Sequence, residues 1–498
     1  MTVNALPAIT SSRIELEPRK GATPAIVTSI KRASYPTRSL QFLRNLEGKS
    51  PGAYSNVESI CKDRKLQLQV TVVGAGIGGL ATSIALAREG HAVTVLEQAS
   101  ALAEVSKACS QVGAGIQIPP NSSRLLLKWG LGPLFEGKAV EPRGITFRRW
   151  ETGNAIGYTK LIPDFRRSFE APYYVIHRAH LHEALHETAV KLGVTVKLNS
   201  RVTEYDQMAP SVKMQDGTIL NSDLIVAADG VKSAARKLIL GRDNKDPIRT
   251  GFAVYRSTID VQKMRDDPQT ATLLHEPALN VWIGPQRHVM SYTIAAGKSF
   301  NLVLSHVDDT DPATWRPEEA LDNMRAQFEG WDPVLTKIIA MIDKTIKWPL
   351  LSGDPSIPSW ISQSSKVIML GDAAHAMVPY MSQGAAMAVE DGAALAAALS
   401  HVYTISDLPK ALSVFDIVRR RRAGQMQEAS LVNGKIWHFD DGPEQAARDE
   451  AMEPEIKGLP ISESPNQWTD PVTQAWAYGY NAEDDIHLSW NQFKSRLF

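Results

Sequence analysis

Residues 366 to 392 (KVIMLGDAAHAMVPYMSQGAAMAVEDG) place an acidic residue between a short apolar run and an alanine-rich run. KVIMLG is predicted to be a buried strand that ends in a turn at Gly371 and Asp372, and residues 384 to 399 are predicted to be a helix. The short carboxylate of Asp372 can accept hydrogen bonds from the hydroxyls of a polyol. A buried strand and helix with an unrelated aspartate between them is the alternative interpretation.

The residues around this turn suit a flat ring that carries negative charge. Ala385 and Ala386, which follow Gly384 at the start of this helix, are small enough for such a ring to lie against the helix N-terminus, whose unpaired amides stabilise negative charge. Gly384 and Ala385 are therefore candidate cofactor contacts. A reduced flavin carries such charge, and Pro379 can form a rigid apolar roof above it. The stretch is therefore a candidate flavin site.

A second candidate site lies in residues 68 to 97, where LQVTVVGAGIGGLATSIALAREGHAVTVLE predicts a strand, a glycine turn, a helix and a second strand. Gly74 permits the tight turn, Gly76 lets a pyrophosphate approach the backbone, and Gly79 allows close packing of helix and sheet. Glu97 ends the second strand, where a ribose-binding carboxylate belongs. Because this acid would repel a 2′-phosphate, the pocket is predicted to take FAD or NAD and not NADP.

Composition limits the possible function classes. The 498 residues include 54 basic and 54 acidic side chains, and this zero formal charge argues against a nucleic-acid-binding surface. With only two cysteines, Cys61 and Cys109, neither a disulfide nor a zinc cluster is expected. This cysteine content favours a reducing compartment, so a cytoplasmic location is expected. No apolar run approaches the roughly 20 residues that span a bilayer.

Residues 1 to 65 precede the first predicted strand and show no sustained periodicity. The absence of acids between Glu17 and Glu47 is compatible with a mitochondrial transit segment, but Glu15 and Glu17 count against one. A disordered leader, or a start codon placed too far upstream, is the preferred interpretation.

Three separated motifs resemble one known family. GAGIGG with Glu97, VAADGVKSAAR at residues 226 to 236, and GDAAHAMVP occur in the order found in single-component flavin-dependent aromatic hydroxylases with the para-hydroxybenzoate hydroxylase fold. The salicylate hydroxylase-like monooxygenases of fungi look most similar, over about residues 66 to 480. The resemblance implies FAD as cofactor, NADH or NADPH as co-substrate, and transfer of one oxygen atom from O2 through a flavin C4a-hydroperoxide to a phenolic small molecule, in aromatic catabolism or secondary metabolism.

The resemblance and the element pattern predict an α/β fold. A Rossmann-like FAD-binding domain is expected to be interwoven with a substrate domain built on a mixed or antiparallel β-sheet, followed by C-terminal helices. The FAD-binding domain is assigned to residues 66–140, 176–245 and 351–400. The substrate domain is assigned to residues 141–175 and 246–350, and a C-terminal helix with an irregular strap to residues 401–498.

The resemblance also implies further cofactor contacts. Arg178 matches an HR-x-x-L pattern and is expected on the flavin side of the cofactor, with an arginine on a solvated helix turn as the alternative. Asp229 is expected near the FAD pyrophosphate, unless it only caps the helix that follows. Ala114 and Gly115 offer a backbone-lined approach to the ring, although residues 106 to 112 (SKACSQV) look like an insertion in that loop.

The strand-rich segment after the cofactor motifs is the expected wall of a substrate pocket. Period-two geometry in HVMSYTI places His288, Met290 and Tyr292 on one face, where His288 and Tyr292 are candidate catalytic residues that hydrogen-bond a phenol and help to remove its proton. A half-buried strand with its polar tips in solvent is the alternative. Tyr255 and Arg256 are similar candidates, and alternation allows only one of them to face the pocket.

Two other features receive structural interpretations. The four histidines between residues 177 and 186 lack a carboxylate or thiolate at ligand spacing, so no metal site is expected. Residues 408 to 432 are predicted to be a long helix on which residues 419 to 422, all arginine, form a solvated face.

Other functions share the same cofactor motifs. A flavin halogenase has this fold, but the sequence lacks the expected Trp-x-Trp-x-Ile-Pro segment. A FAD-dependent epoxidase, or another flavin oxidoreductase with a non-aromatic substrate, is one alternative. A non-catalytic escort protein of the Rab-inhibitor type, which needs no flavin, is the other.

Overall fold

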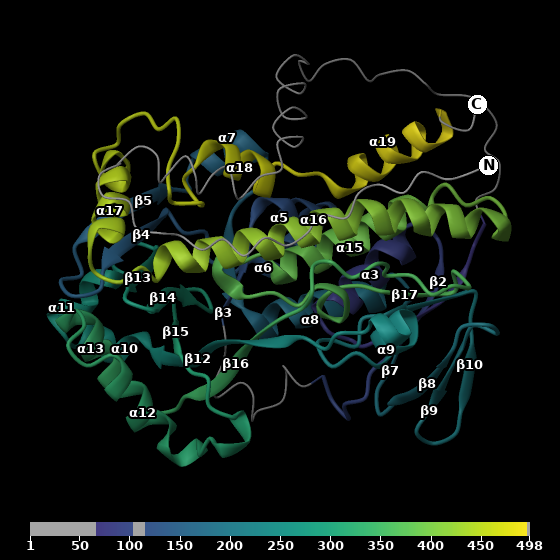
Figure 1. The fold of residues 1–498 in the computed structure, drawn as a ribbon, viewed down its shortest axis with the longest axis horizontal. Helices are drawn as coiled ribbons and strands as arrows, with labels where there is room; N and C mark the ends of the chain where they lie inside the picture. Colours follow the sequence, from purple (N-terminus) through teal and green to yellow (C-terminus); the bar gives the residue numbers. More distant parts are fainter. Residues whose placement is uncertain (1–65, 103–114, 496–498) are drawn as a thin grey trace. The chain divides into compact units, whose positions relative to one another are not determined.

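The computed structural model describes residues 66–102 and 115–495 (Figure 1). Within them, a parallel sheet has the strand order β17-β11-β1-β2-β7. The strands are β1 (Gln69–Val73), β2 (Ala92–Leu96), β7 (Thr195–Lys197), β11 (Leu224–Ala227) and β17 (Val367–Met369). The inner strands are apolar and buried, as expected for a parallel sheet covered by helices. Helices α3 (Ile77–Arg88) and α15 (Gly384–Leu399) contribute to the same hydrophobic core.

The predicted cofactor motifs all follow strands of this sheet. The glycine turn follows β1, Glu97 follows β2, Asp229 comes after β11, and Asp372 comes after β17. Because the carboxyl ends of parallel strands lie at one edge of a sheet, motifs that are distant in the sequence meet there. The strand and helix predicted around Asp372 are confirmed as β17 and α15.

A second, seven-stranded sheet has the order β16-β12-β15-β14-β13-β4-β5. Its neighbouring strands are antiparallel except for β13 and β4, so the sheet is mixed. The strands are β4 (Gly144–Arg149), β5 (Ala155–Lys160), β12 (Ile248–Asp260), β13 (Leu279–Gly284), β14 (Arg287–Ile294), β15 (Ser299–Val307) and β16 (Ile346–Ser352). Helices α10 (Val261–Arg265), α12 (Ala320–Gln327) and α13 (Pro333–Ala340) share a hydrophobic core with this sheet.

Shorter elements complete the description. β3 (Gly115–Ile118) pairs with β6 (Tyr174–His177), which leads directly into α8 (Arg178–Lys191). β8 (Val202–Asp206), β9 (Ser211–Met214) and β10 (Ile219–Asn221) form a small antiparallel sheet. Gly217 has a positive φ of 86° in the turn between β9 and β10, where an Asp-Gly pair is typical of a hairpin.

The C-terminal region is more helical than predicted. The long helix α16 (Leu408–Trp437) lies alongside α15 (Figure 1). It is followed by α17 (Pro443–Ile456), α18 (Pro471–Tyr478) and α19 (Ala482–Ser495), so the expected irregular strap is wrong for most of this region. Pro443 and Pro471 stand at first helical positions, where proline is favoured, so these two prolines begin helices and do not interrupt them.

The predicted fold class is confirmed, since the strands of the two sheets alternate along the chain. The individual domain boundaries stay a prediction. None of the helices in the described residues combines the length and apolar character needed to cross a bilayer.

Candidate functional site

A cavity of about 370 Å³ opens where the carboxyl edge of the parallel sheet meets the seven-stranded sheet. Both sheets contribute to its lining, and so do the segment before α15 and the strand β3. The predicted site residues that line it are Gly76, Gly115, Arg178, His288, Tyr292, Asp372, Pro379, Gly384 and Ala385. The structure therefore brings together both predicted cofactor turns and most of the candidate catalytic residues.

The three glycines of the first turn occupy different environments. Gly74 has a φ of 103°, and a Cβ atom there would lie 2.4 Å from the carbonyl oxygen of Ala228. A Cβ on Gly79 would lie 1.9 Å from the carbonyl oxygen of Gly74, so this position needs glycine for packing. A Cβ on Gly76 would meet no protein atom within 4 Å. Gly76 thus faces open space at the N-terminus of α3, where a pyrophosphate can bind.

These environments predict opposite effects of two similar substitutions. Gly76→Ala should leave the stability of the apoprotein nearly unchanged but weaken FAD binding by about tenfold or more, about 1.4 kcal/mol, because the new methyl group projects into the pyrophosphate position. Gly79→Ala should destabilise the apoprotein itself. Thermal unfolding of both apoproteins, followed by FAD titration, separates the two effects. Unchanged FAD affinity in Gly76→Ala would refute this placement of the pyrophosphate.

Glu97 lies against the glycine turn. Its Oε2 accepts a hydrogen bond from the backbone N–H of Ala75 (2.8 Å), and its Oε1 accepts one from Ala99 (2.9 Å). On the other side of the turn, Nε2 of His182 lies 2.6 Å from the carbonyl oxygen of Ala75. The carboxylate is fixed at the end of β2, and each oxygen keeps acceptor capacity for a ribose hydroxyl.

Asp372 is the first residue of the short helix α14 (Asp372–His375), directly after Gly371, whose φ is 60°. Its exposed carboxylate lines the cavity and makes no hydrogen bond or ion pair within the described residues. The turn itself is anchored from α15, because Oδ2 of Asp391 accepts hydrogen bonds from Gly371 N–H (3.0 Å) and from Nε2 of His375 (2.6 Å). Asp372 is therefore free to accept hydrogen bonds from a ligand in a turn of fixed geometry.

The anchoring carboxylate belongs to a buried ionic cluster. Nε of Arg419 lies 2.8 Å from Oδ1 of Asp391, and its Nη1 lies 2.7 Å from Oε2 of Glu390. Nη2 of Arg422 lies 3.2 Å from Oε1 of Glu390. Burial opposes ionisation of Asp391, but the neighbouring His375 and Arg419 outweigh it and lower its pKa to about 2. The cluster links α15, which borders the cavity, to α16.

The interpretation of residues 419 to 422 as a solvated face is wrong for Arg419 and Arg422, which are 0% and 2% exposed. Residues three apart share one face of a helix, and here that face points at α15. A signal was present in the sequence, because Glu390 and Asp391 stand in an otherwise apolar, alanine-rich helix. Buried carboxylates require cationic partners, and an arginine-rich helix further along the chain could supply them.

Asp229 does not line the cavity. Its Oδ2 accepts hydrogen bonds from the Tyr205 hydroxyl (3.1 Å) and from the backbone N–H of Ala234 (3.0 Å), the first residue of α9 (Ala234–Leu240). This arrangement matches the capping alternative. A cofactor contact of Asp229 stays a prediction.

Tyr255 requires a correction. It is 1% exposed, and its ring stacks on His306 at 4.8 Å in the core on the other side of β12. Because side chains alternate along a strand, its neighbour Arg256 lines the cavity instead. The candidate catalytic role of Tyr255 is therefore withdrawn, and Arg256 takes its place in the site.

The shared face predicted for β14 is confirmed, since His288, Met290 and Tyr292 all line the cavity. Burial raises the pKa of Tyr292. Burial, together with a second histidine, lowers the pKa of His288 well below its ordinary value. That second histidine is His438, whose Nε2 lies 2.8 Å from Nδ1 of His288. Sequence reasoning missed this pair, and no local pattern links residues from such distant elements.

Several predicted features lie outside the described residues. They are Ala114, the insertion at residues 106 to 112 and the leader at residues 1 to 65. Gly115, which follows, is described: its N–H donates to Oδ1 of Asn301 (2.7 Å) and it packs closely against the ring of Tyr292.

Comparisons with known proteins agree with this geometry. A family model described as FAD binding domain matches residues 67–430. FAD-dependent monooxygenase OpS4 of Beauveria bassiana (strain ARSEF 2860) is 35% identical over 83% of this chain and 95% of its own length. A 3-hydroxybenzoate 6-hydroxylase of Polaromonas naphthalenivorans (strain CJ2) is 32% identical over 84% of this chain and 98% of its own. A solved salicylate hydroxylase substrate complex shares the fold with a TM-score of 0.67 at 23% identity, over 85% of this chain and 98% of that one.

Proposed function

This chain belongs to the FAD binding domain family and is a FAD-dependent monooxygenase of the aromatic hydroxylase type, and from that premise we propose that it hydroxylates a phenol bearing a carboxylate, using NADH or NADPH and O2. The observation that carries the substrate class is the position of Arg256 in the cavity wall.

The described residues fit FAD. Gly76 leaves room for the pyrophosphate, Glu97 is held against the glycine turn where it could accept a hydrogen bond from a ribose hydroxyl, and Asp372 offers an unpaired acceptor for the ribityl hydroxyls. Gly384 and Ala385 allow the ring to lie at the N-terminus of α15, whose amides favour negative charge on it. When bound there, FAD supplies the redox chemistry that delivers one oxygen atom from O2 to the substrate.

The substrate side of the cavity is formed by β12, β14 and β15 together with the segment that contains Pro379. Met290 and Val303 give this part of the lining apolar side chains, and Pro379 forms a rigid part of its wall. Such a wall excludes water from the reacting ring, which favours oxygen transfer to the substrate over loss of the oxygen as hydrogen peroxide.

Arg256 is a half-buried cation with no ion pair to a carboxylate within the described residues. Burial lowers its pKa, and the neighbouring positive charge of Arg178 lowers it further. An anionic ligand strongly stabilises a desolvated guanidinium that lies next to a second positive charge. The planar set of N–H donors of the guanidinium also matches the two oxygens of a carboxylate. A hydroxybenzoate combines that carboxylate with the electron-rich ring that the oxygen transfer requires.

The proposal is tested with a panel of phenol, salicylate, 3-hydroxybenzoate and 4-hydroxybenzoate. We expect at least one acid to stimulate both NAD(P)H oxidation and O2 uptake, and to give a product that is heavier by one oxygen atom. Oxidation of NAD(P)H without a hydroxylated product from any member of the panel would refute the proposal. Oxygenation of an alkene instead would favour the epoxidase alternative.

Arg256→Met should raise the KM for the hydroxybenzoate substrate by about 10- to 100-fold, because a charge-assisted hydrogen bond contributes about 1.5–3 kcal/mol. The KM for unsubstituted phenol should change little, since phenol has no carboxylate to bind. Arg249→Met is the matched control on the same strand, because Arg249 binds backbone carbonyls of residues 308 to 310 outside the cavity. An equal KM increase for phenol and for the acid would contradict a carboxylate contact.

A further inference from the structure

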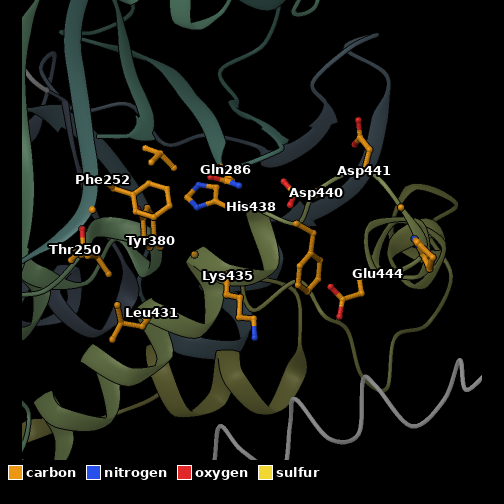
Figure 2. Close-up of a pocket in the computed structure, with 17 residues that line it drawn as sticks. Thr250, Phe252, Gln286, Tyr380, Leu431, Lys435, His438, Asp440, Asp441 and Glu444 are labelled. Carbon is orange, nitrogen blue, oxygen red and sulfur yellow. The ribbon is translucent and has the colours of Figure 1, made fainter. Parts of the chain in front are cut away.

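A second hollow, a groove of about 770 Å³, lies on the other side of the segment that contains Pro379. Tyr380, from that segment, lines it, together with Phe252 of β12 and residues at the end of α16. Figure 2 shows His438 in its wall beside Phe252, with Asp440, Asp441 and Glu444 towards one end. Neither the cofactor motifs nor the proposed substrate site uses this groove.

His438 connects the groove to the cavity. Its Nε2 lies 2.8 Å from Nδ1 of His288, which lines the cavity, and the two rings stack at 5.1 Å. Phe252 stacks on His438 at 4.9 Å, and Tyr380 contacts both histidines edge-on. The side chains of His288 and His438 are only 2% and 9% exposed. One hydrogen bond between two buried imidazoles thus links the cavity to the groove.

Both imidazoles are neutral near pH 7. Burial lowers the pKa of His288 well below its ordinary value, with His438 as a second cause. Burial and the nearby Arg448 lower the pKa of His438 to about 3. A neutral pair shares one N–H···N hydrogen bond, which leaves one nitrogen of each ring for other partners. Because Nδ1 of His288 and Nε2 of His438 face each other, the remaining nitrogens are Nε2 of His288 and Nδ1 of His438.

We propose that His288 and His438 form a proton path that carries the phenolic proton of the bound substrate out to the groove. The inference rests on the proposed phenol hydroxylation. It assigns a role to the groove as the exit for the proton, and it makes His438 a proton-relay residue that acts through His288 without touching the substrate.

The transfer is balanced at each atom. The O–H bond of the phenol breaks as its proton joins Nε2 of His288, while the Nδ1 proton of His288 moves to Nε2 of His438. The Nδ1 proton of His438 then passes to water in the groove, so neither ring keeps a charge. The same path in reverse returns a proton to the hydroxylated product and restores both tautomers.

The other titratable groups of the cavity suit this role less well. Arg178 and Arg256 are cations, and burial keeps Tyr292 protonated by raising its pKa. Asp372 stands at the turn assigned to the flavin. Among the described residues that line the cavity, His288 is therefore the neutral base on the substrate side. Burial disfavours the charged form of His288, so a proton that it accepts must be passed on.

His438→Phe keeps the aromatic packing but removes the second acceptor. With the best acid of the panel at saturation, we expect the hydroxylation rate to fall by about 100-fold, at the low end of general base effects. FAD content and substrate affinity should stay unchanged. A ring-fluorinated analogue, whose phenol is already more ionised, should lose much less rate. Leu431→Ala, in the same groove but apart from the histidine pair, is the control and should behave like the wild type.

Chemical rescue gives an independent test with His438→Ala, because the groove can admit a small base. Added imidazole should raise the hydroxylation rate of His438→Ala at least tenfold. In contrast, 1-methylimidazole fills the same space but has one nitrogen blocked, so it should not restore the rate. Equal rescue by both compounds would mean that His438 acts by packing alone and would overturn the proton path.

The outcomes separate the two proposals. A wild-type protein that hydroxylates no phenol overturns the proposed function. A wild-type protein that hydroxylates a phenol, with His438→Phe at the same rate, overturns the proton path alone.

Discussion

Replacement of Arg419 by methionine is expected to lower the free energy of unfolding by about 3–5 kcal/mol, the cost of leaving buried charges without their partner. Arg419 is fully buried and contacts both Glu390 and Asp391. Among the described residues, its loss leaves Asp391 with His375 and the Gly371 N–H as partners, and it leaves Glu390 dependent on Arg422 and Asn121. Denaturant titration of the FAD-loaded protein, with circular dichroism and flavin fluorescence recorded together, measures the effect.

Arg421→Met provides the control on the same helix. Arg421 pairs with Asp485 at 3.2 Å, but its side chain is 59% exposed, so the change should stay below about 1 kcal/mol. Similar losses in both variants would show that helix α16, rather than the buried cluster, determines the stability. We also expect Arg419→Met to release flavin before it unfolds, because the cluster anchors the Asp372 turn.

Asp372→Ala is expected to give poorly flavinated protein, with FAD binding weakened by about 10- to 100-fold. The carboxylate lines the cavity without a protein partner among the described residues, and hydrogen bonds to a charged group contribute about 1.5–3 kcal/mol. The absorbance ratio of flavin to protein after purification, followed by FAD titration of the apoprotein, measures this loss.

Asp372→Asn separates hydrogen bonding from charge. The amide keeps one acceptor oxygen at the same place, so its FAD affinity should lie between those of the wild type and Asp372→Ala. Full flavin content and full hydroxylation in Asp372→Ala would mean that this turn does not bind the cofactor. The thermal stability of the two apoproteins should remain alike, because the Asp372 side chain has no hydrogen bond or ion pair to lose among the described residues.

Local sequence patterns were enough to predict the glycine turn, the helix α15 and the shared face of β14. Gly74, Gly76 and Gly79 defined the first turn, and the alanine-rich run starting at Gly384 defined α15, because each depends on nearby sequence alone. The common face of His288 and Tyr292 followed from strand alternation in the same way. Parallel strands that end at one edge then explain why such distant motifs share a cavity.

The rest depended on which elements pack together. Alternation showed that Tyr255 and Arg256 face opposite ways, but the side of β12 that lines the cavity is set by the packing of α10, α12 and α13 on the other face. Residues 419 to 422 looked like a solvated run because charge alone does not reveal which side of a helix contacts α15. The role of His438 could not be predicted either, because its partner His288 comes from a strand that is distant in the sequence.

The buried cluster also has a consequence for the order of biosynthesis. Arg422 donates hydrogen bonds to the backbone carbonyls of Trp476 and Ala477, and its guanidinium lies over the ring of Tyr480. Ribosomes make these residues well after α15 and α16. A nascent chain that has emerged only as far as α16 therefore lacks the partners that complete the charge network around α15. The charge network around α15 is therefore expected to be complete only after residues 476 to 480 have been made.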